Sequence, residues 1–340
     1  MLFAITIFAS VRHYRKILGK RVMWIGVLCG LLAGAMWGMV FIVPQLLPAF
    51  SPVELAVGRY TAYGAIALLL MLPRLHALFG RLEQSDYAAL LRHALAGNIV
   101  YYMLLALGVK LAGVAPTSLI IGVLPIAVTL LGRKDHGAVA LRSLALPLLV
   151  VAAGIACINV DVFRHALASN ANIGRTLLGL ACATGALLCW SWYTIDNTRY
   201  LKRNPHFSSA EWSALYGLAS GAIALLIGAA CLAIWHEDVT GAAGAASGRD
   251  WTVFWITNAL LALCASVIGN HLWNIASRRV PVTLSGQLIL FETLFALLYG
   301  FIHAHPYPRP LEAAAVVLLI VGVVWAVRVH AVQASSALHP

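Results

Sequence analysis

Ten apolar runs of roughly 20 residues follow one another along the chain, separated by short segments that carry charge, proline or glycine. The runs cover residues 22–44, 53–72, 86–110, 114–132, 143–161, 175–198, 209–235, 251–276, 281–303 and 310–329. About 20 mostly apolar residues in a helix cross a bilayer core about 30 Å thick, so each run predicts one membrane-spanning helix. None shows the sustained apolar–polar alternation of a transmembrane barrel strand. The predicted fold class is therefore an all-α integral membrane bundle of ten transmembrane helices.

The composition excludes the soluble classes. Of the 340 residues, 61% are hydrophobic and 10% are charged, whereas a soluble domain averages about 45–50% apolar and about 25% charged residues. Too little polar surface remains to cover a water-facing globule of this size. A soluble enzyme, a nucleic-acid-binding domain and a disordered protein are therefore excluded, and the lipid bilayer is the expected environment.

The basic residues are divided unequally between the two sides of the predicted bundle. The formal net charge is +11, from 23 lysines and arginines and 12 acidic residues. By alternate loops, 17 basic residues fall on the side of the N-terminus and 5 on the other side, while Arg59 lies inside the second run. Because cytoplasmic loops are enriched in lysine and arginine, both termini are predicted to be cytoplasmic. The charge forms no single basic stripe, so no nucleic-acid partner is expected.

The two halves of the sequence resemble each other. Residues 51–70 (SPVELAVGRYTAYGAIALLL) and 208–227 (SSAEWSALYGLASGAIALLI) share nine of twenty positions at a constant offset of 157 residues. Each half then holds five runs, and because five is an odd number, the second half must begin on the opposite side of the membrane. Such an inverted repeat is characteristic of secondary transporters, whose substrate site lies near the bilayer midplane between the halves.

Several short motifs accompany the repeat. They are AMWG at 35–38, FSP at 50–52, Arg59, SLIIGVLP at 118–125 and LCWSWYT at 188–194. With these motifs, residues 23–329 resemble the drug/metabolite transporter superfamily, in particular its ten-helix EamA-type members. The chain departs from the family pattern at Glu292-Thr293, where members usually have Glu-Pro. The resemblance implies a small-molecule permease of the inner membrane, without a cofactor, that most often exports amino acids or related metabolites.

The sequence divides into four parts. Residues 1–21 are a basic N-terminal extension, predicted to be cytoplasmic and either disordered or interfacial. Residues 22–161 and 175–329 are predicted to form the first and second EamA-like five-helix repeats, and residues 330–340 a cytoplasmic tail. A monomer or a weak homodimer is expected.

Glu292 and Arg59 are the charges that lie deepest in the predicted spans. At 1.5 Å per residue, Glu292 lies about 16 Å from the cytoplasmic end of its helix, and Arg59 about 8 Å below the external end of the second helix. A charge at such depth is costly against lipid, so it should face a cavity or a partner. Glu292 is interpreted as the ligand of a substrate amine or as a proton-coupling group, and Arg59 as the ligand of a substrate carboxylate. The alternatives are an ion pair between the two, a buried neutral carboxylic acid, and snorkelling of Arg59.

Further polar and aromatic side chains lie near mid-depth on the predicted helices. Polar groups are expensive against lipid, so these faces are expected to point into the bundle, toward the substrate path. The candidates for substrate binding or coupling are Trp37, Asn98, Tyr101, Tyr102, Trp190, Tyr193, Asn270, His271 and Gln287. Trp37 and Trp190 are equivalent positions of the two repeats and are predicted to line opposite ends of a central cavity, while His271 is a candidate proton relay. Interhelical hydrogen bonding and packing are the alternatives.

Three other acidic residues receive structural interpretations. Glu54 and Glu211 are each the third residue after a serine, which is the spacing of a capping box at a helix start. Asp196 lies near Arg199, which predicts an ion pair at the membrane interface. None of the three is expected to bind substrate.

The sequence contains no Walker A, H-E-x-x-H or G-x-S-x-G motif, so neither ATP-driven transport nor these hydrolytic sites are expected. No catalytic residues, metal ligands or cofactors are predicted. The predicted function is export of a small metabolite, such as an amino acid or a related zwitterion, by alternating access, with proton coupling left open. The alternative is efflux of cationic or aromatic drug-like compounds. An intramembrane enzyme or a channel is the weaker alternative.

Overall fold

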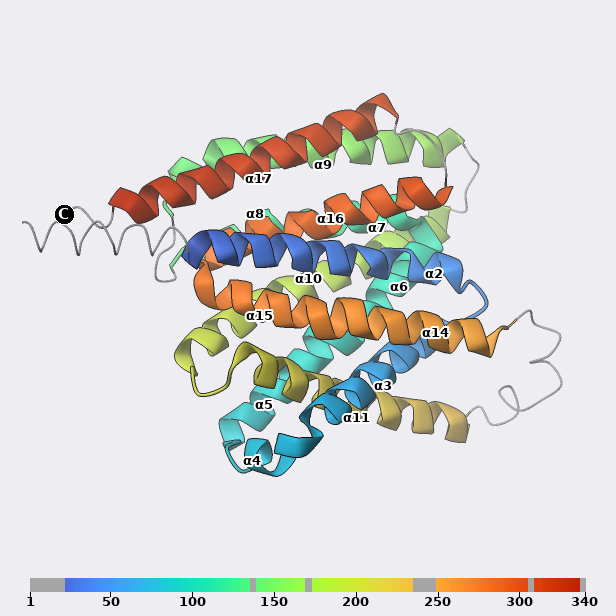
Figure 1. The fold of residues 1–340 in the computed structure, drawn as a ribbon. Coiled ribbons are helices and arrows are strands. Elements are labelled where there is room, and N and C mark those ends of the chain that lie inside the picture. The colour runs from blue at the N-terminus through green and yellow to red at the C-terminus, as the bar shows by residue number, and fades with distance from the viewer. Residues whose placement is uncertain (1–21, 135–138, 169–172, 235–248, 305–308, 337–340) are drawn as a thin grey trace, which may run out of the picture.

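The computed structural model describes residues 22–134, 139–168, 173–234, 249–304 and 309–336, and within these ranges every regular element is helical (Figure 1). The first span is Val22–Leu46 and ends in η1 (Met39–Phe41) and α2 (Val43–Leu46). The first half continues with α3 (Pro52–Met71), η2 (Leu72–Arg74), α4 (Leu75–Phe79), α5 (Gln84–His93), η3 (Ala94–Ile99), α6 (Val100–Ala112), α7 (Val114–Ile121), α8 (Leu124–Leu131) and α9 (Leu141–Ala168). The second half comprises α10 (Ile173–Arg203), α11 (Ser209–Ile234), α14 (Trp251–Leu261), η4 (Ala262–Ile268), α15 (Gly269–Arg279), α16 (Val282–Ala304) and α17 (Pro310–Ser336).

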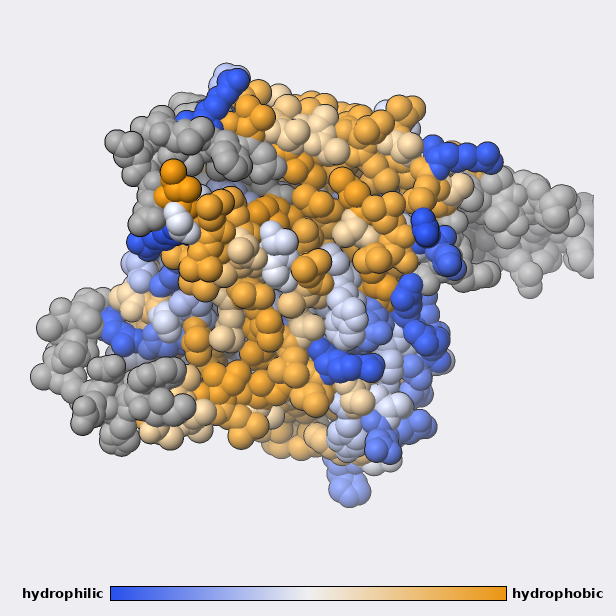
Figure 2. Space-filling model, turned by 180° about the vertical axis from the view of Figure 1, so that it is seen from behind, coloured by the Kyte–Doolittle hydropathy of each residue, from blue (hydrophilic) through white to orange (hydrophobic). Residues whose placement is uncertain are grey.

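Eight helical stretches of the described ranges are long and apolar enough to cross a membrane. Figure 2 shows the corresponding surface, with apolar residues across the middle of the molecule and hydrophilic residues gathered toward its two ends. The fourth predicted run is divided between α7 and α8, which have 8 residues each, whereas the fifth lies within the 28-residue helix α9. The all-helical membrane fold is confirmed, and the count of ten spans stays a prediction.

Proline accounts for the interruption of the fourth run. α7 and α8 are separated at Gly122 and Val123, just before Pro125. Proline has no N–H for the helix ladder, and its ring collides with the carbonyl four residues earlier, which here belongs to Ile121. Pro44 opens α2 in a similar way, after the 3-10 turn η1. The first and fourth predicted helices are therefore interrupted at defined residues.

Each half contains a π-helical turn in its third helix. η3 joins α5 to α6 in the first half, and η4 joins α14 to α15 in the second. A π turn replaces i→i−4 hydrogen bonds by i→i−5 bonds, and such turns recur at functional sites. The apolar pattern of the sequence gave no sign of either turn.

The halves pack through equivalent helices. α3 lies against α11, α8 against α16 and α9 against α17, and α3 and α11 run in opposite directions (Figure 1). The α3–α11 crossing centres on Gly64 and Gly221, which are the same position of the two repeats. A Cβ atom on Gly221 would lie only 2.7 Å from Gly64 Cα, so both helices need glycine there. This crossing is the local axis that relates the two inverted repeats.

One end of the bundle is fastened around the start of α3. The N–H of Ser51 donates to the Glu54 carboxylate at 2.7 Å, and the Ser51 hydroxyl accepts from the Glu54 N–H. Arg249 pairs with Glu54, and its guanidinium lies 4.8 Å over the ring of Phe50. Lys110, near the end of α6, donates to the Phe50 carbonyl. We call Phe50, Glu54, Lys110 and Arg249 the Ser51-end clamp.

The opposite end repeats this arrangement around the start of α11. Ser208 and Glu211 form the same reciprocal hydrogen bonds, at 2.7 and 3.1 Å. Arg81 pairs with Glu211 at 2.7 Å and lies 4.9 Å over the ring of Phe207, while Arg278 donates to the Phe207 carbonyl at 2.6 Å. We call Phe207, Glu211, Arg81 and Arg278 the Ser208-end clamp. The predicted capping roles of Glu54 and Glu211 are thus confirmed.

The last helix is longer than its apolar run predicts. α17 continues to Ser336, past the predicted end at residue 329. It does so because His330 is buried and its Nε2 lies 2.9 Å from the hydroxyl of Thr283 on α16, which keeps the two helices together. The predicted extension at residues 1–21 lies outside the described residues.

Candidate functional site

Glu292 is held against the first span by a row of glycines. Gly30 and Gly34 lie four residues apart on one face of that span and meet α16. A Cβ atom on Gly34 would lie 2.9 Å from the backbone nitrogen of Glu292, so only glycine permits this approach. Glu292 is 1% exposed. The close packing thus places a carboxylate in the interior of the bundle.

The Glu292 carboxylate uses only part of its hydrogen-bonding capacity. The hydroxyl of Tyr101 on α6 donates to its Oε1 at 3.0 Å. Among the described residues, Oε2 has no hydrogen-bond partner at full bonding geometry, and the indole N–H of Trp190 on α10 is close enough to act on the carboxylate as a weak donor. A buried carboxylate oxygen without a donor is costly, so it is a natural place for a ligand that brings a donor or a positive charge.

Four aromatic rings form a column that begins at Tyr101. Tyr101 stacks on Trp190 with ring centroids 4.8 Å apart, Trp190 stacks on Tyr193 at 4.9 Å, and Tyr193 stacks on Tyr216 at 5.5 Å. The rings come from α6, α10 and α11, so the column joins both halves. We call these four residues the aromatic column. It offers flat apolar faces beside the carboxylate.

The π turn η3 makes room for this column. Gly97 lies in η3, and a Cβ atom there would lie 2.5 Å from both the Tyr193 ring and the Tyr216 hydroxyl. Any other residue would push the rings apart. Asn98, the next residue, donates to Ser220 Oγ at 2.7 Å and ties η3 to α11. The predicted polar position at Asn98 therefore supports the column from the side.

Trp37 and Trp190 contact each other directly. Their ring centroids are 5.0 Å apart in an edge-to-face arrangement, and Trp37 also lies 5.3 Å from Trp273. The prediction that the two equivalent tryptophans line opposite ends of a cavity is therefore wrong, because the two rings are in contact. The Trp37 indole N–H donates to the Ala265 carbonyl at 2.9 Å, inside the π turn η4.

Arg59 lies on α3 beside the second π turn. Its Nε donates to Ser266 Oγ at 3.1 Å, and its guanidinium lies 4.7 Å over the ring of Tyr102 and 5.0 Å over that of Tyr60. Arg59 is 4% exposed, and its Nη1 has no hydrogen-bond partner among the described residues. Arg59 and Glu292 influence each other electrostatically, but no ion pair within 4.0 Å joins them. Burial also excludes snorkelling of Arg59 in this conformation.

The structure brings some of the predicted residues together and separates others. Asn270 donates to the Tyr63 hydroxyl at 3.4 Å, close to the aromatic column. Gln287 is buried against α8, where its amide donates to Thr129 Oγ1 at 2.9 Å. His271 lines a separate cavity of about 110 Å³ together with residues of α3 and α11.

The candidate site is thus a cluster of five residues, two of which carry buried charges. We call Arg59, Tyr101, Tyr102, Trp190 and Glu292 the central cluster. It presents a donor on Arg59 and an acceptor on Glu292, both buried and without hydrogen-bond partners among the described residues, between aromatic faces.

Sequence reasoning missed the supports of this cluster. They are Ser266, which holds Arg59, the carbonyl of Ala265, which holds Trp37, and Gly97 with Tyr216, which complete the column. Both Ser266 and Ala265 take their positions from a π turn. Within the described ranges, no group of three or more His, Cys, Asp or Glu side chains is placed to hold a metal ion.

The sequence and the fold were compared with those of known proteins. The model of the EamA-like transporter family matches the chain twice, at residues 24–160 and 177–328. The "Inner membrane protein YtfF" of Escherichia coli (strain K12) is 33% identical over 308 residues, which cover 89% of this chain and 95% of that protein. A solved crystal structure with 20% sequence identity superposes with a TM-score of 0.64 over 88% of this chain and 96% of its own, which shows the fold alone.

Proposed function

The chain belongs to the EamA-like transporter family, and from this membership and the central cluster we propose that it exports an amino acid or a related zwitterion by alternating access. The observation that carries the proposal is the pair of unpartnered buried groups, Nη1 of Arg59 and Oε2 of Glu292. A zwitterion would supply one carboxylate and one ammonium group, which are the partners that these two side chains lack. Movement of the two halves relative to each other would then expose the central cluster to one side of the membrane at a time.

The chemistry of each end of the substrate follows from charge. The guanidinium of Arg59 is a planar donor that matches a carboxylate. Glu292 would accept from the ammonium group at Oε2 while Oε1 keeps its bond from Tyr101. Since both charges are shielded from water, each is worth more to a ligand of opposite charge than it would be at the surface. The aromatic column would contact the remainder of the substrate.

The alternating-access cycle is supported by the equivalent construction of the two ends. Each end has its own clamp, and each clamp joins an arginine of one half to a glutamate of the other. Opening one end breaks the contacts of that clamp only. An export cycle would load the substrate at the cytoplasmic end and release it at the other.

Efflux of planar cations is the second candidate function. It is favoured by the aromatic column, which ends on the Glu292 carboxylate, because cations bind well to aromatic faces next to a negative charge. In that case Glu292 alone would bind the charged group, and Arg59 would serve a structural role through Ser266 and Tyr102.

The proposal also includes location and assembly. The chain is a multi-pass protein that we place in the inner membrane, in line with the name of the Escherichia coli relative. Both termini are assigned to the cytoplasm from the distribution of basic residues. A monomer or a weak homodimer is sufficient, because the central cluster comes from a single chain. Proton coupling is included, with Glu292 or another titratable group as the coupling site.

Transport by the purified protein in proteoliposomes tests these alternatives. Radiolabelled L-amino acids and the planar cation ethidium serve as probes, under imposed pH and substrate gradients. Glu292→Gln should lower transport of either probe by about tenfold to a hundredfold, since a lost charge-assisted hydrogen bond costs about 1.5–3 kcal/mol. Arg59→Ala should abolish amino-acid transport and spare ethidium efflux if the substrate is a zwitterion.

Two controls make the result interpretable. Tyr101→Phe removes a hydroxyl that touches Glu292, whereas Tyr299→Phe removes one that donates to the Ala35 carbonyl at 3.0 Å, outside the central cluster. Only the first should alter transport. If Glu292→Gln transports at the wild-type rate with unchanged pH dependence, the role of Glu292 is wrong. If no probe moves under any gradient, the transporter proposal itself is rejected.

A further inference from the structure

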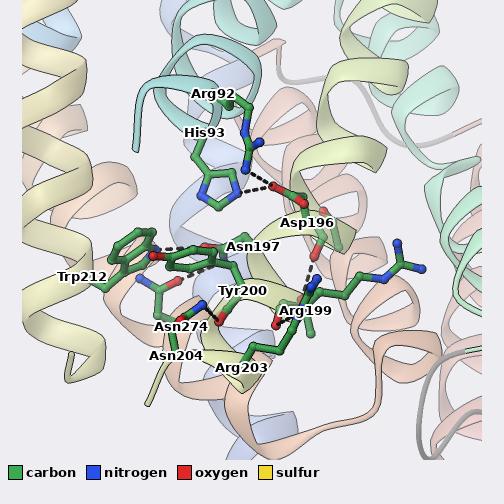
Figure 3. Close-up of polar contacts among 12 residues, drawn as sticks. Arg92, His93, Asp196, Asn197, Arg199, Tyr200, Arg203, Asn204, Trp212 and Asn274 are labelled. Atoms are coloured by element: carbon green, nitrogen blue, oxygen red, sulfur yellow. Dashed lines mark hydrogen bonds and ion pairs between the residues drawn. The ribbon is translucent and has the colours of Figure 1, made fainter. Parts of the chain in front are cut away.

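A buried histidine lies at the Ser208 end of the bundle, apart from the central cluster. His93 is the last residue of α5 and is 0% exposed. Its Nε2 lies 2.9 Å from the Oδ2 of Asp196 on α10, and Arg92 lies 3.7 Å from the same oxygen. Figure 3 shows the imidazole and the Arg92 guanidinium meeting this one carboxylate. Asp196 is 28% exposed, so it connects the buried ring to the aqueous side.

Aromatic rings enclose the remaining faces of His93. Tyr193 lies 5.6 Å from its centroid, Tyr200 6.0 Å and Trp212 6.2 Å. The titratable and charged groups that face the imidazole are therefore Asp196, Tyr193 and Tyr200 from α10 and Arg92 from its own helix. α11 contributes Trp212, and η3 has no titratable residue.

More distant charges act on Asp196 or are paired elsewhere. Arg203 on α10 is within electrostatic reach of Asp196. Asp86 on α5 accepts from the Tyr200 hydroxyl and lies 3.6 Å from His206. His93 and Asp196 therefore form a local unit.

The hydrogen bond to Asp196 fixes where a proton can be added. A carboxylate only accepts, so Nε2 of His93 must carry the hydrogen of this bond. The free position of a neutral imidazole is then Nδ1, which is buried and has no partner among the described residues. A proton on Nδ1 would become a buried N–H without an acceptor while this end is closed. Protonation of His93 therefore favours a conformation in which this end opens to water.

His93 is also connected to the substrate site. It directly precedes the π turn η3, whose Gly97 packs against the aromatic column. The ring of His93 meets Tyr193 of that column edge-on. Movement of α5 that exposes His93 must shift η3, because the two segments are continuous.

We propose that Nδ1 of His93 is the proton-binding site that makes the opening of the Ser208 end depend on the pH of the water at that end, while Glu292 is reserved for the substrate. The inference rests on the proposed transport function. The proton adds to the Nδ1 lone pair from water when this end is open and returns to the same water before the end closes, so it sets how readily this end opens and does not cross the membrane. Asp196 stabilises the imidazolium through Nε2 and is a positioning residue.

His93→Gln separates proton binding from architecture. The glutamine amide can still donate to Asp196, but it takes up no proton near neutral pH. In proteoliposomes with radiolabelled L-amino acids, counterflow by the wild type should change by about tenfold between mildly alkaline and mildly acidic pH, in the range of ordinary coupling between two sites, and counterflow by the variant should not. At mildly alkaline pH the two proteins should transport at similar rates. His206→Gln, at an exposed histidine of the same end, is the matched control and should keep the pH dependence of the wild type.

A conformational readout works without any substrate. In a variant free of native cysteines, Leu201→Cys reports opening of the Ser208 end, because Leu201 is 1% exposed. Labelling by a water-soluble maleimide, corrected for the intrinsic pH dependence of the thiol, should rise on acidification with His93 present. With His93→Gln it should be independent of pH. Asp196→Asn should keep the response and move it to lower pH, since the imidazolium loses its counter-charge.

The outcomes distinguish this inference from the proposed function. If the wild type shows no counterflow, the transport function fails, and the labelling experiment still decides the proton site. If the wild type transports and His93→Gln retains pH-dependent counterflow and pH-dependent labelling, the proton site is elsewhere and only this inference is overturned. If His93→Gln does not fold, the shifted response of Asp196→Asn supports the proposal, and an unshifted response contradicts it.

Discussion

The two ends of the bundle are built on the same set of contacts, and the Ser208 end adds a histidine–aspartate pair to them. Each end has a phenylalanine, a serine–glutamate capping box, an arginine from the opposite half and a basic residue on the phenylalanine carbonyl. At the Ser208 end, His93 precedes the π turn and meets Asp196, which lies six residues after Trp190. The equivalent positions at the Ser51 end are Leu261, just before η4, and Val43, six residues after Trp37.

The comparison shows which contacts are needed to close an end and which are present at one end only. Leu261 and Val43 are both buried in the hydrophobic core, at 4% exposure each. An apolar pair is therefore sufficient to close an end. A buried histidine–aspartate pair is no improvement in stability, because desolvation offsets most of the attraction between such groups. The His93–Asp196 pair at the Ser208 end is thus better explained by a functional role than by its contribution to stability.

The largest loss of stability is expected from a substitution at the α3–α11 crossing, which is common to both repeats. Gly221→Ala would place a Cβ atom 2.7 Å from Gly64 Cα, against backbone that has no side chain to move. We expect a loss of about 3 kcal/mol, at the upper end for overpacking, seen as a lower thermal midpoint in detergent. Gly300→Ala is the control, since its Cβ would meet Val114 at an ordinary 3.8 Å. Equal midpoints for the two variants would contradict the Gly64–Gly221 axis.

The second prediction transfers the polar pair to the other end. Leu261→His buries an imidazole with no partner and should cost about 2 kcal/mol, and Val43→Asp alone should cost at least as much. If the ends are equivalent, the double variant should recover about 1 kcal/mol or more through the new pair. Unfolding free energies of the four proteins in detergent give the coupling energy through the double-mutant cycle. A coupling energy of zero would show that the ends differ in geometry as well as in chemistry.

The sequence predicts the frame well because its signals are local. Apolar runs placed the starts of the helices to within a few residues, although α9 and α17 end later than predicted. The spacing of Ser208 and Glu211 gave the capping box correctly. The depth of Glu292 in its helix likewise followed from counting residues, and the structure buries it as expected.

The tertiary contacts of the predicted site residues could not be predicted from local sequence patterns. Asp196 was interpreted as pairing with nearby Arg199, which stays a prediction, and its hydrogen bond to His93, 103 residues earlier, was not predicted. Two π turns move Ser266 and Ala265 to where they hold Arg59 and Trp37, and no periodicity in the sequence marks them. Contacts that depend on how distant helices cross were therefore missed, whereas the type of each helix was not.

The third prediction compares the accessibility of both ends after either the Ser208-end clamp or the Ser51-end clamp is weakened. Arg81→Gln removes one ion pair and one cation–π contact, and Arg249→Gln removes one ion pair and two cation–π contacts. Each set is worth about 1 kcal/mol because the arginines are partly exposed. Without native cysteines, the first should raise maleimide labelling at Leu201→Cys and the second at Leu47→Cys, since both positions are buried. Each should lower labelling at the far end, because an alternating cycle opens one end at a time. Increased labelling at both ends in either variant would contradict this reciprocity.

The smallest effect tests whether the ends are energetically equal as well as similar in form. Ser51→Ala and Ser208→Ala each remove a hydroxyl that accepts from the backbone N–H of a glutamate, at 3.2 and 3.1 Å. An N-cap of this kind contributes about 0.5–1 kcal/mol, so the two thermal midpoints should fall by similar small amounts. Thr184→Ala is the control, because that hydroxyl donates to a carbonyl within α10 and caps nothing. A much larger fall for Ser208→Ala would mean that the Ser208 end stores stability in its cap, and that its polar pair is part of a stronger closure than the one at the Ser51 end.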